Sequence, residues 1–202
     1  MGTKGTQTKD RLMDIAEQLI LQQGFAATSI EEIISEAGIT KGGFFYHFDG
    51  KNELAVALME RYQETDRLLF GGLFKRAREL SDDPLQQMLI FIKLLSETMS
   101  DLEGLHPGCL VASFTYESHK VNDQVRAITA ACVMDWRQQF KEQLDHIDAH
   151  YTANTQTSSR ELADMLSTII EGGIIVSRAM NNPSILVEQL LQYRAYIGLL
   201  YQ

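Results

Sequence analysis

The segment Lys41–Phe48, with the sequence KGGFFYHF, concentrates the side chains whose types and spacing suggest contact chemistry. Two glycines near a helix start permit close approach of the backbone to a partner surface. Phe45 could contact a thymine methyl group in a major groove. Tyr46, His47 and Lys41 could donate hydrogen bonds to phosphate oxygens. The segment therefore suggests a surface for double-stranded nucleic acid.

An aromatic core helix is the alternative interpretation of the same segment. Each glycine weakens a helix by about 1 kcal/mol relative to alanine. Packing of Phe44 and Phe48, four residues apart on one face, would compensate, so we expect both rings in the core. Phe45, Tyr46 and His47 are adjacent and cannot all face one core. Periodicity alone leaves both interpretations open for these three residues.

The elements that must position this segment are helices, because apolar residues recur with helical spacing nearly throughout the chain. In the first fifty residues the expected helices cover 7–23, 29–37 and 41–48. Ser29 and Glu32 have the spacing of a capping box, and Thr40 is a good N-cap for the third helix. Two short helices joined by a tight turn that begins with Gly38 predict a helix-turn-helix.

The remaining residues predict about six longer helices, with the clearest boundary at Asp83-Pro84. The expected ranges are 51–80, which Gly71-Gly72 could bend or stop, 84 to a loop that begins at 103, 109–118, 122–150, 159–180 and 183–201. The length of 202 residues and the 45% content of hydrophobic residues suit one compact unit or two small subdomains. No apolar run approaches the ~20 residues of a membrane span, and the polar start lacks a secretory signal, so we expect a cytoplasmic protein.

Many residues at fixed spacing between about Arg11 and Tyr62 closely resemble the TetR family of bacterial transcription regulators. They are Gly24-Phe25, Thr28-Ser29-Ile30, Ile33, Ala37–Gly42, Phe44–Phe48, Lys51 and Leu54. The resemblance implies an all-α fold, with an N-terminal three-helix helix-turn-helix DNA-binding domain over 1–50. A larger helical effector-binding and dimerisation domain would cover 51–202. The implied function is a dimeric regulator, most commonly a repressor that a small-molecule effector releases from operator DNA, without a cofactor or membrane attachment.

The same resemblance assigns DNA contacts residue by residue. Gly43 and Phe45 would lie against base edges, and Tyr46, His47 and Lys51 would contact phosphates. Thr28 and Ser29 would lie near a phosphate at the start of the second helix, where free N–H groups favour an anion. Lys41 would contact a base or a phosphate. Phe45 stands where many members have tyrosine and Gly43 where many have a larger side chain, so readout could rest on DNA shape.

The C-terminal part would hold a dimer interface and an effector pocket. The pair Gly172-Gly173 interrupts an apolar helix and would let another helix approach closely. The candidate interface residues are Ile169, Gly172, Gly173, Val176, Leu186, Leu190, Tyr193 and Ile197. Candidate pocket walls are Phe91, Leu95, Met99, Cys109, Phe114, Tyr116, Cys132, Met134 and Trp136. An ordinary core within the chain is the alternative for both sets.

The charge of the chain opposes DNA binding at long range. It carries 18 basic and 27 acidic residues, a net charge of −9. Residues 1–67 alone carry 7 basic and 11 acidic residues, a net charge of −4. Phosphate contact therefore requires segregated charge, with the carboxylates turned away and the following cations turned toward DNA: Lys4, Lys9, Lys41, His47 and Lys51. Glu31, in the first turn of the second helix, conflicts with this arrangement.

Three further hypotheses concern other residues. Cys109 follows a glycine at a probable helix start, where a thiolate is stabilised, so a redox- or electrophile-sensing regulator is one alternative and a small buried hydrophobe the other. His146 and His150 have metal-ligand spacing but are better explained as a solvated helix end, and no metal is expected. A helical protein-interaction module is the alternative that needs no DNA. No motif of an enzyme is recognisable.

Overall fold

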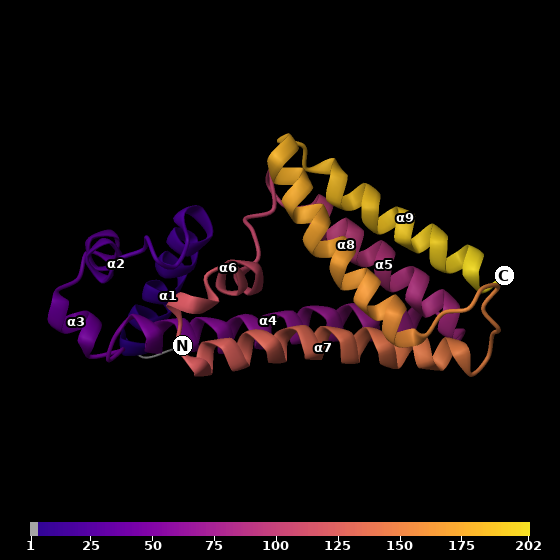
Figure 1. The fold of residues 1–202 in the computed structure, drawn as a ribbon, viewed down its shortest axis with the longest axis horizontal. Coiled ribbons are helices and arrows are strands. Elements are labelled where there is room, and N and C mark those ends of the chain that lie inside the picture. Colours follow the sequence, from indigo (N-terminus) through magenta and orange to yellow (C-terminus); the bar gives the residue numbers. More distant parts are fainter. Residues whose placement is uncertain (1–3) are drawn as a thin grey trace. The chain divides into compact units, whose positions relative to one another are not determined.

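A computed structural model describes residues 4–202, and these residues form an all-α fold (Figure 1). The described part contains nine α-helices, one 3-10 helix and no strand. The α-helices are α1 Lys4–Gln23, α2 Ile30–Ala37, α3 Lys41–Phe45, α4 Lys51–Leu80, α5 Pro84–Ser100, α6 Leu110–Tyr116, α7 Asp123–Asp148, α8 Ser159–Met180 and α9 Ser184–Leu200. The 3-10 helix η1 covers Ser118–Lys120. The predicted fold class is confirmed.

Local capping sets the helix-turn-helix formed by α2 and α3. The Ser29 hydroxyl accepts a hydrogen bond from the Glu32 N–H at 3.1 Å, and the Glu32 carboxylate accepts one from the Ser29 N–H at 2.7 Å. This second bond lowers the pKa of Glu32. Gly38 ends α2 with a left-handed φ of 62°, and the Thr40 hydroxyl caps α3 by accepting from the Gly43 N–H. The predicted capping box and turn are confirmed.

The third helix is shorter than the sequence predicts. It ends at Phe45 rather than at Phe48, although the Phe48 N–H still donates to the Phe44 carbonyl at 3.1 Å. Phe44 and Phe48 are both buried, as expected, with ring centroids 5.8 Å apart. The physical reason is that the buried rings fix the segment, while a helix with two glycines in its first turn has little propensity to extend further.

The remaining helices follow the predicted boundaries within a few residues. α4 continues without a break through Gly71-Gly72, so these glycines do not stop it. Asp83 caps α5, and Pro84 occupies its first turn. α7 ends at Asp148, where the prediction extended to residue 150.

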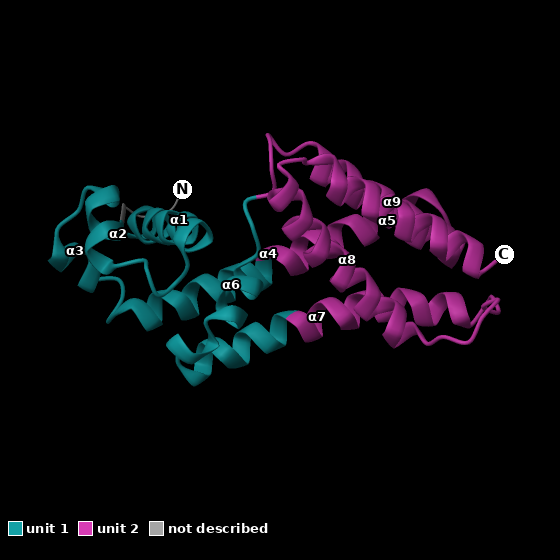
Figure 2. Ribbon diagram, turned by 45° about the horizontal axis from the view of Figure 1, so that its top comes forward, with its two compact units in different colours: residues 1–64, 107–132 teal, residues 65–106, 133–202 magenta. Residues whose placement is uncertain are grey.

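The chain divides into two compact units, coloured separately in Figure 2. Unit 1 comprises residues 1–64 and 107–132, and unit 2 comprises residues 65–106 and 133–202. Within unit 1, α1 packs against α2 and α6, whereas within unit 2, α9 packs against α5 and α8. α4 and α7 contribute residues to both units. The predicted division into residues 1–50 and 51–202 separates functions rather than compact units, and it stays a prediction.

None of the described helices is long and apolar enough to cross a membrane.

Asp83 provides a stability test in unit 2. Its carboxylate accepts hydrogen bonds from the Gln86 N–H and the Tyr151 hydroxyl, and the latter bond is the main cause of its lowered pKa. A carboxyl group with a lowered pKa stabilises the fold above its ordinary value of 3.8, and this stabilisation is lost as the pH falls. Asp83→Asn keeps a capping side chain but removes the charge, so we expect a loss of up to about 1 kcal/mol at pH 7.

Urea denaturation of the full chain at pH 7 and near pH 3 measures this difference. The two proteins should converge in stability at the lower pH, because Asp83 is then increasingly protonated. Asp82→Asn is the matched control, because Asp82 is exposed and forms no hydrogen bond or ion pair within residues 4–202. An equal loss at both pH values would show that the Asp83 charge is not responsible.

Candidate nucleic-acid interface

The aromatic residues that follow Phe44 lie at the surface of unit 1. Phe45 is 42% exposed and Tyr46 is 82% exposed, whereas Phe44 and Phe48 are buried. His47 is half-buried, and its ring meets the Tyr46 ring edge-on with 4.9 Å between centroids. The core interpretation is therefore correct for Phe44 and Phe48 and wrong for Phe45 and Tyr46. These two side chains form an exposed aromatic surface at the end of α3.

The two glycines of α3 are not required by the packing of the protein itself. Neither has a positive φ. A Cβ atom built on Gly42 would lie 3.9 Å from its nearest neighbour, and one built on Gly43 would lie 3.5 Å from its nearest neighbour. Both distances are ordinary contacts, so alanine would fit at either position. The absent side chains leave the backbone of α3 open to an approaching partner.

The side chain of Thr28 is turned inward, so a phosphate contact at this helix start would have to come from the backbone, as the sequence analysis expects. It is 1% exposed, and its hydroxyl donates to the Gly24 carbonyl at 2.9 Å. The Ser29 hydroxyl donates to the Glu32 carboxylate at 2.8 Å in addition to capping α2. The expected phosphate contact through backbone N–H groups at this helix start stays a prediction, and the Glu32 carboxylate lies beside these groups.

Lys51 is also engaged inside unit 1. Its ammonium donates to the Phe25 carbonyl and lies 4.1 Å from the centroid of the Phe25 ring. Burial is the main cause of the lowered pKa of Lys51. In this conformation the ammonium holds the chain between α1 and α2 and is not directed to a phosphate. This conformation does not support the expected phosphate contact of Lys51, and the sequence could not show that Phe25 lies beside this lysine.

Two of the other expected cations also interact with neighbouring groups of unit 1. Lys41 is exposed but forms an ion pair with Glu31, with 3.5 Å between Nζ and Oε1. The ammonium of Lys9 lies over the Phe48 ring at 5.4 Å. The side chain of Lys4 lies outside the described part of the chain. The conflict expected at Glu31 is therefore present, since this carboxylate directly neutralises an exposed lysine of α3.

Glu117 holds the chain between α1 and α2 and was missed by the sequence reasoning. Its carboxylate accepts a hydrogen bond from the Ala26 N–H at 2.6 Å. A Cβ atom built on Gly24 would lie 2.2 Å from Glu117 Oε1, so the carboxylate occupies space that only glycine leaves free. Nearby, the Phe114 ring packs on the Phe25 ring with 5.4 Å between centroids. These residues are about 90 positions apart, and no local pattern indicates the pairing.

The candidate effector residues belong to different units. Phe91, Leu95, Met99, Met134 and Trp136 belong to unit 2, and Cys109, Phe114, Tyr116 and Cys132 belong to unit 1. Several of these side chains already contact other residues of the protein. Phe91 stacks on Phe74 with 3.8 Å between centroids, and Trp136 Nε1 donates to Asp66 at 3.0 Å. Tyr116 is 74% exposed and Met134 is also exposed, so both side chains lie at the surface and neither suits an enclosed wall.

The candidate interface residues divide into two groups. Gly173, Leu186, Leu190, Tyr193 and Ile197 are buried within the chain, so the core alternative is correct for them in this structure. The other candidates, Ile169, Gly172 and Val176, line a mainly apolar surface groove of about 210 Å³. Gly173 also lines this groove, together with two residues outside the candidate set, Ile185 and Gln189. Apolar side chains of α8 and α9 are also exposed, namely Met165, Ile175, Met180, Leu191, Tyr196 and Leu199.

Cys109 and the two histidines show no assembled site. Cys109 is buried at the start of α6, and its sulfur accepts a hydrogen bond from the Tyr62 hydroxyl at 3.5 Å. The side chain of His150 is hydrogen-bonded to the His146 carbonyl at 2.8 Å. Among residues 4–202, no group of three or more His, Cys, Asp or Glu side chains could hold a metal ion.

This fold and this exposed α3 surface define a class of DNA-binding protein, and comparisons with known proteins identify it. Residues 12–58 match the family described as "Bacterial regulatory proteins, tetR family". Residues 84–189 match the family described as "Transcriptional regulator LmrA/YxaF-like, C-terminal domain". The chain belongs to the TetR family of transcriptional regulators, with a C-terminal domain of the LmrA/YxaF type. It is therefore a DNA-binding regulator, and the family is not one of enzymes.

Relatives match over nearly the whole chain. The HTH-type transcriptional regulator LmrA of Bacillus subtilis is 27% identical over 179 residues, which cover 87% of this chain and 88% of that protein. The HTH-type transcriptional repressor DhaR of a Mycobacterium species is 22% identical and covers 88% of this chain and 85% of that protein.

Solved structures support the fold. A TetR transcriptional regulator from Chloroflexus aurantiacus has a TM-score of 0.81 at 22% identity, covering 98% of both chains. The reduced form of E. coli NemR has a TM-score of 0.77 at 18% identity, covering 97% of both chains.

The Glu31–Lys41 ion pair yields a prediction for DNA affinity. Glu31→Gln frees Lys41 and removes a charge that repels phosphates, so we expect DNA binding to become about two- to fivefold tighter. The logarithm of affinity should also fall more steeply with the logarithm of salt concentration, because a freed lysine can displace a further counterion. Fluorescence anisotropy with a duplex from upstream of the gene, at several salt concentrations, measures both effects.

Glu36→Gln is the matched control for this measurement. Glu36 is exposed on the same helix, and its replacement changes the net charge by the same amount. If both variants bind equally tightly, the effect comes from net charge and the ion pair has no specific role.

Proposed function

We propose that the protein is a homodimeric repressor that binds operator DNA through α3 and is released by a small-molecule effector. The observation that carries this proposal is the surface at α3, where Phe45 and Tyr46 are exposed beside two glycines that the packing does not require. Because a transcriptional regulator acts on DNA, we place the protein in the cytoplasm.

The proposed DNA contacts are narrower than those suggested by the sequence. Gly43 and Phe45 would lie against base edges, and Tyr46, His47 and Lys41 would contact phosphates. Ser29 would contribute its backbone at the start of α2. We leave out the Thr28 hydroxyl and the Lys51 ammonium, because both are bonded within unit 1.

A second copy of the chain is the proposed occupant of the α8–α9 surface. The groove beside Gly172 is mainly apolar, and neighbouring apolar side chains of both helices are exposed. Large exposed apolar patches are typical of protein interfaces. Two helices from each subunit would make a four-helix interface around a two-fold axis. This symmetry would present two α3 segments to the DNA.

An effector in the helical remainder would act by preferring one of two conformations of the protein. α4 is one continuous helix that contributes to both units, which supports it as the element that transmits the change. No particular observation favours Cys109 as a sensor, since its thiol is buried and hydrogen-bonded to Tyr62.

Tyr46→Ala tests the DNA-binding surface. We expect at least about tenfold weaker binding to a duplex from upstream of the gene, because a phosphate hydrogen bond and aromatic contact area are lost. Thermal unfolding should be nearly unchanged, since Tyr46 is 82% exposed. Mobility-shift titration measures the affinity.

Tyr116→Ala is the matched control, because Tyr116 is an exposed tyrosine of the same unit outside α3. It should bind DNA like the unmodified protein. Normal DNA binding by Tyr46→Ala would exclude the proposed role of this surface.

A further inference from the structure

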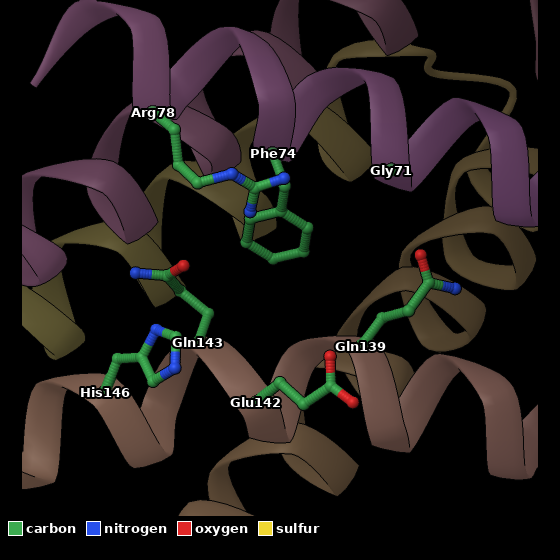
Figure 3. Close-up of a pocket in the computed structure, with 7 residues that line it drawn as sticks. All are labelled: Gly71, Phe74, Arg78, Gln139, Glu142, Gln143 and His146. Carbon is green, nitrogen blue, oxygen red and sulfur yellow. The ribbon is translucent and has the colours of Figure 1, made fainter.

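Unit 2 contains a cavity between α4 and α7, with both polar and apolar walls, that none of the predicted effector residues lines. Its volume is about 190 Å³. α4 contributes Gly71, Phe74 and Arg78, and α7 contributes Gln139, Glu142 and His146 (Figure 3). The side chains of the two helices face the same space in this view. Arg78, Glu142 and His146 are exposed, so a small molecule can enter from solvent.

Two side chains that line this cavity carry hydrogen-bond donors without a partner among residues 4–202. The Nε2 atom of Gln139 is buried and forms no hydrogen bond. Within residues 4–202, the guanidinium of Arg78 forms neither an ion pair nor a hydrogen bond. A buried donor without an acceptor is unfavourable, and a ligand with suitable oxygen atoms would supply the missing acceptor. Gln143 also lines the cavity, but its side-chain amide already donates a hydrogen bond to the Pro84 carbonyl at 2.9 Å.

Gly71 keeps part of this cavity free. It lies inside α4, where glycine destabilises a helix relative to alanine. Its φ is not positive, and a Cβ atom built on it would meet nothing within 4 Å. Neither backbone conformation nor packing therefore requires glycine. Since Gly71 lines the cavity, a larger side chain would take up space that a ligand could use.

The walls indicate the chemistry of the ligand. Arg78 offers a cation whose planar fork suits a carboxylate. Phe74 provides an aromatic wall and is held in place by its stacking on Phe91. Glu142 offers a carboxylate that can accept a hydrogen bond from a hydroxyl group. A cavity of about 150 Å³ is known to hold benzene, so this cavity has room for a single ring.

We propose that this cavity binds a small aromatic carboxylate. The carboxylate pairs with Arg78, the ring lies against Phe74, and a polar substituent meets Gln139 and Glu142. Binding at this site does not depend on the function proposed above. The further step, that the ligand changes DNA binding, rests on that function.

Isothermal titration calorimetry of the full chain with 4-hydroxybenzoate tests the site. We expect a Kd below about 1 mM, which is reasonable for a ligand of about ten non-hydrogen atoms. The neutral analogue 4-hydroxybenzamide should bind at least about tenfold more weakly, because the charge-assisted bond to Arg78 is lost. No measurable binding of 4-hydroxybenzoate, or equal binding of both compounds, would overturn the proposal.

Two variants locate the binding within the cavity. Arg78→Gln removes the cation and Gly71→Leu fills the space, and each should weaken binding at least about tenfold. Arg76→Gln is the matched control, because Arg76 lies on the same helix and pairs with Glu79 outside the cavity. It should leave the Kd unchanged. Circular dichroism checks that the variants fold. Unaltered affinity in both cavity variants would overturn the assignment.

Adding 4-hydroxybenzoate to the DNA complex separates the site from its regulatory role. Release of DNA that is abolished in Arg78→Gln would support both. Binding by calorimetry without any change in DNA affinity would keep the site and overturn only its role in regulation. DNA binding that fails from the start would instead contradict the proposed function, while calorimetry would still decide the site.

Discussion

Replacing Gly173 by valine is expected to lower the free energy of unfolding by about 3 kcal/mol. A Cβ atom on Gly173 would lie 2.7 Å from Leu186 Cδ1 and 3.2 Å from Leu186 Cα. The Cδ1 atom can move by rotation of its side chain, but the Cα atom belongs to the backbone of α9. The new side chain must therefore push α9 away from α8. Urea denaturation at a fixed protein concentration measures the loss.

Gly172→Ala is the control, one residue away in the same helix. A Cβ atom there meets nothing within 4 Å. We expect stability to be unchanged or higher by up to about 1 kcal/mol, because alanine favours the helix. If the α8–α9 surface is the dimer interface, this variant should associate differently in sedimentation experiments at the same concentration. Equal losses in both variants would mean that helix propensity, not the α8–α9 contact, decides the effect.

Replacing Gly24 by alanine is expected to cost about 2–3 kcal/mol in unit 1. Gly24 has a φ of 87°, in the left-handed region that side chains with a Cβ atom rarely adopt. The added methyl group would also displace the Glu117 carboxylate from its position at the Ala26 N–H. Strain and the lost hydrogen bond should both contribute. Thermal and urea unfolding measure their combined effect.

A double-mutant cycle with Glu117→Ala separates the two contributions. In the Glu117→Ala background, Gly24→Ala should cost only the backbone strain, so the combined loss is smaller than the sum of the single losses. Glu117→Ala should also weaken DNA binding, because it releases the chain that leads into α2. Strictly additive losses would show that Glu117 does not interact with this chain in solution.

Local sequence signals predicted most of the helix-turn-helix. The capping box at Ser29, the glycine end of α2 and the threonine cap of α3 depend on residues at most five positions apart. The same holds for Phe44 and Phe48, whose spacing places both rings on one side. Interactions of this range can be recognised in a sequence because the helix geometry fixes them.

The directions of side chains at the site are harder to predict, and some depend on contact between distant residues. The sequence pattern predicts a surface position for Lys51. Its ammonium instead donates a hydrogen bond to the carbonyl of Phe25, which lies 26 positions away in the sequence. Tyr116 was predicted to line a pocket and is exposed. The directions of these side chains depend on neighbours that local periodicity does not specify.

The sequence by itself determined the all-helical class, the helix boundaries within a few residues and the family, because capping and periodicity act along one segment. Only the tertiary structure decided that Gly173 faces Leu186 while Gly172 faces open space, and that Glu117 reaches Ala26. Those contacts join segments far apart in the chain. Their geometry follows from how whole helices pack, and the spacing of residues within one helix does not contain it.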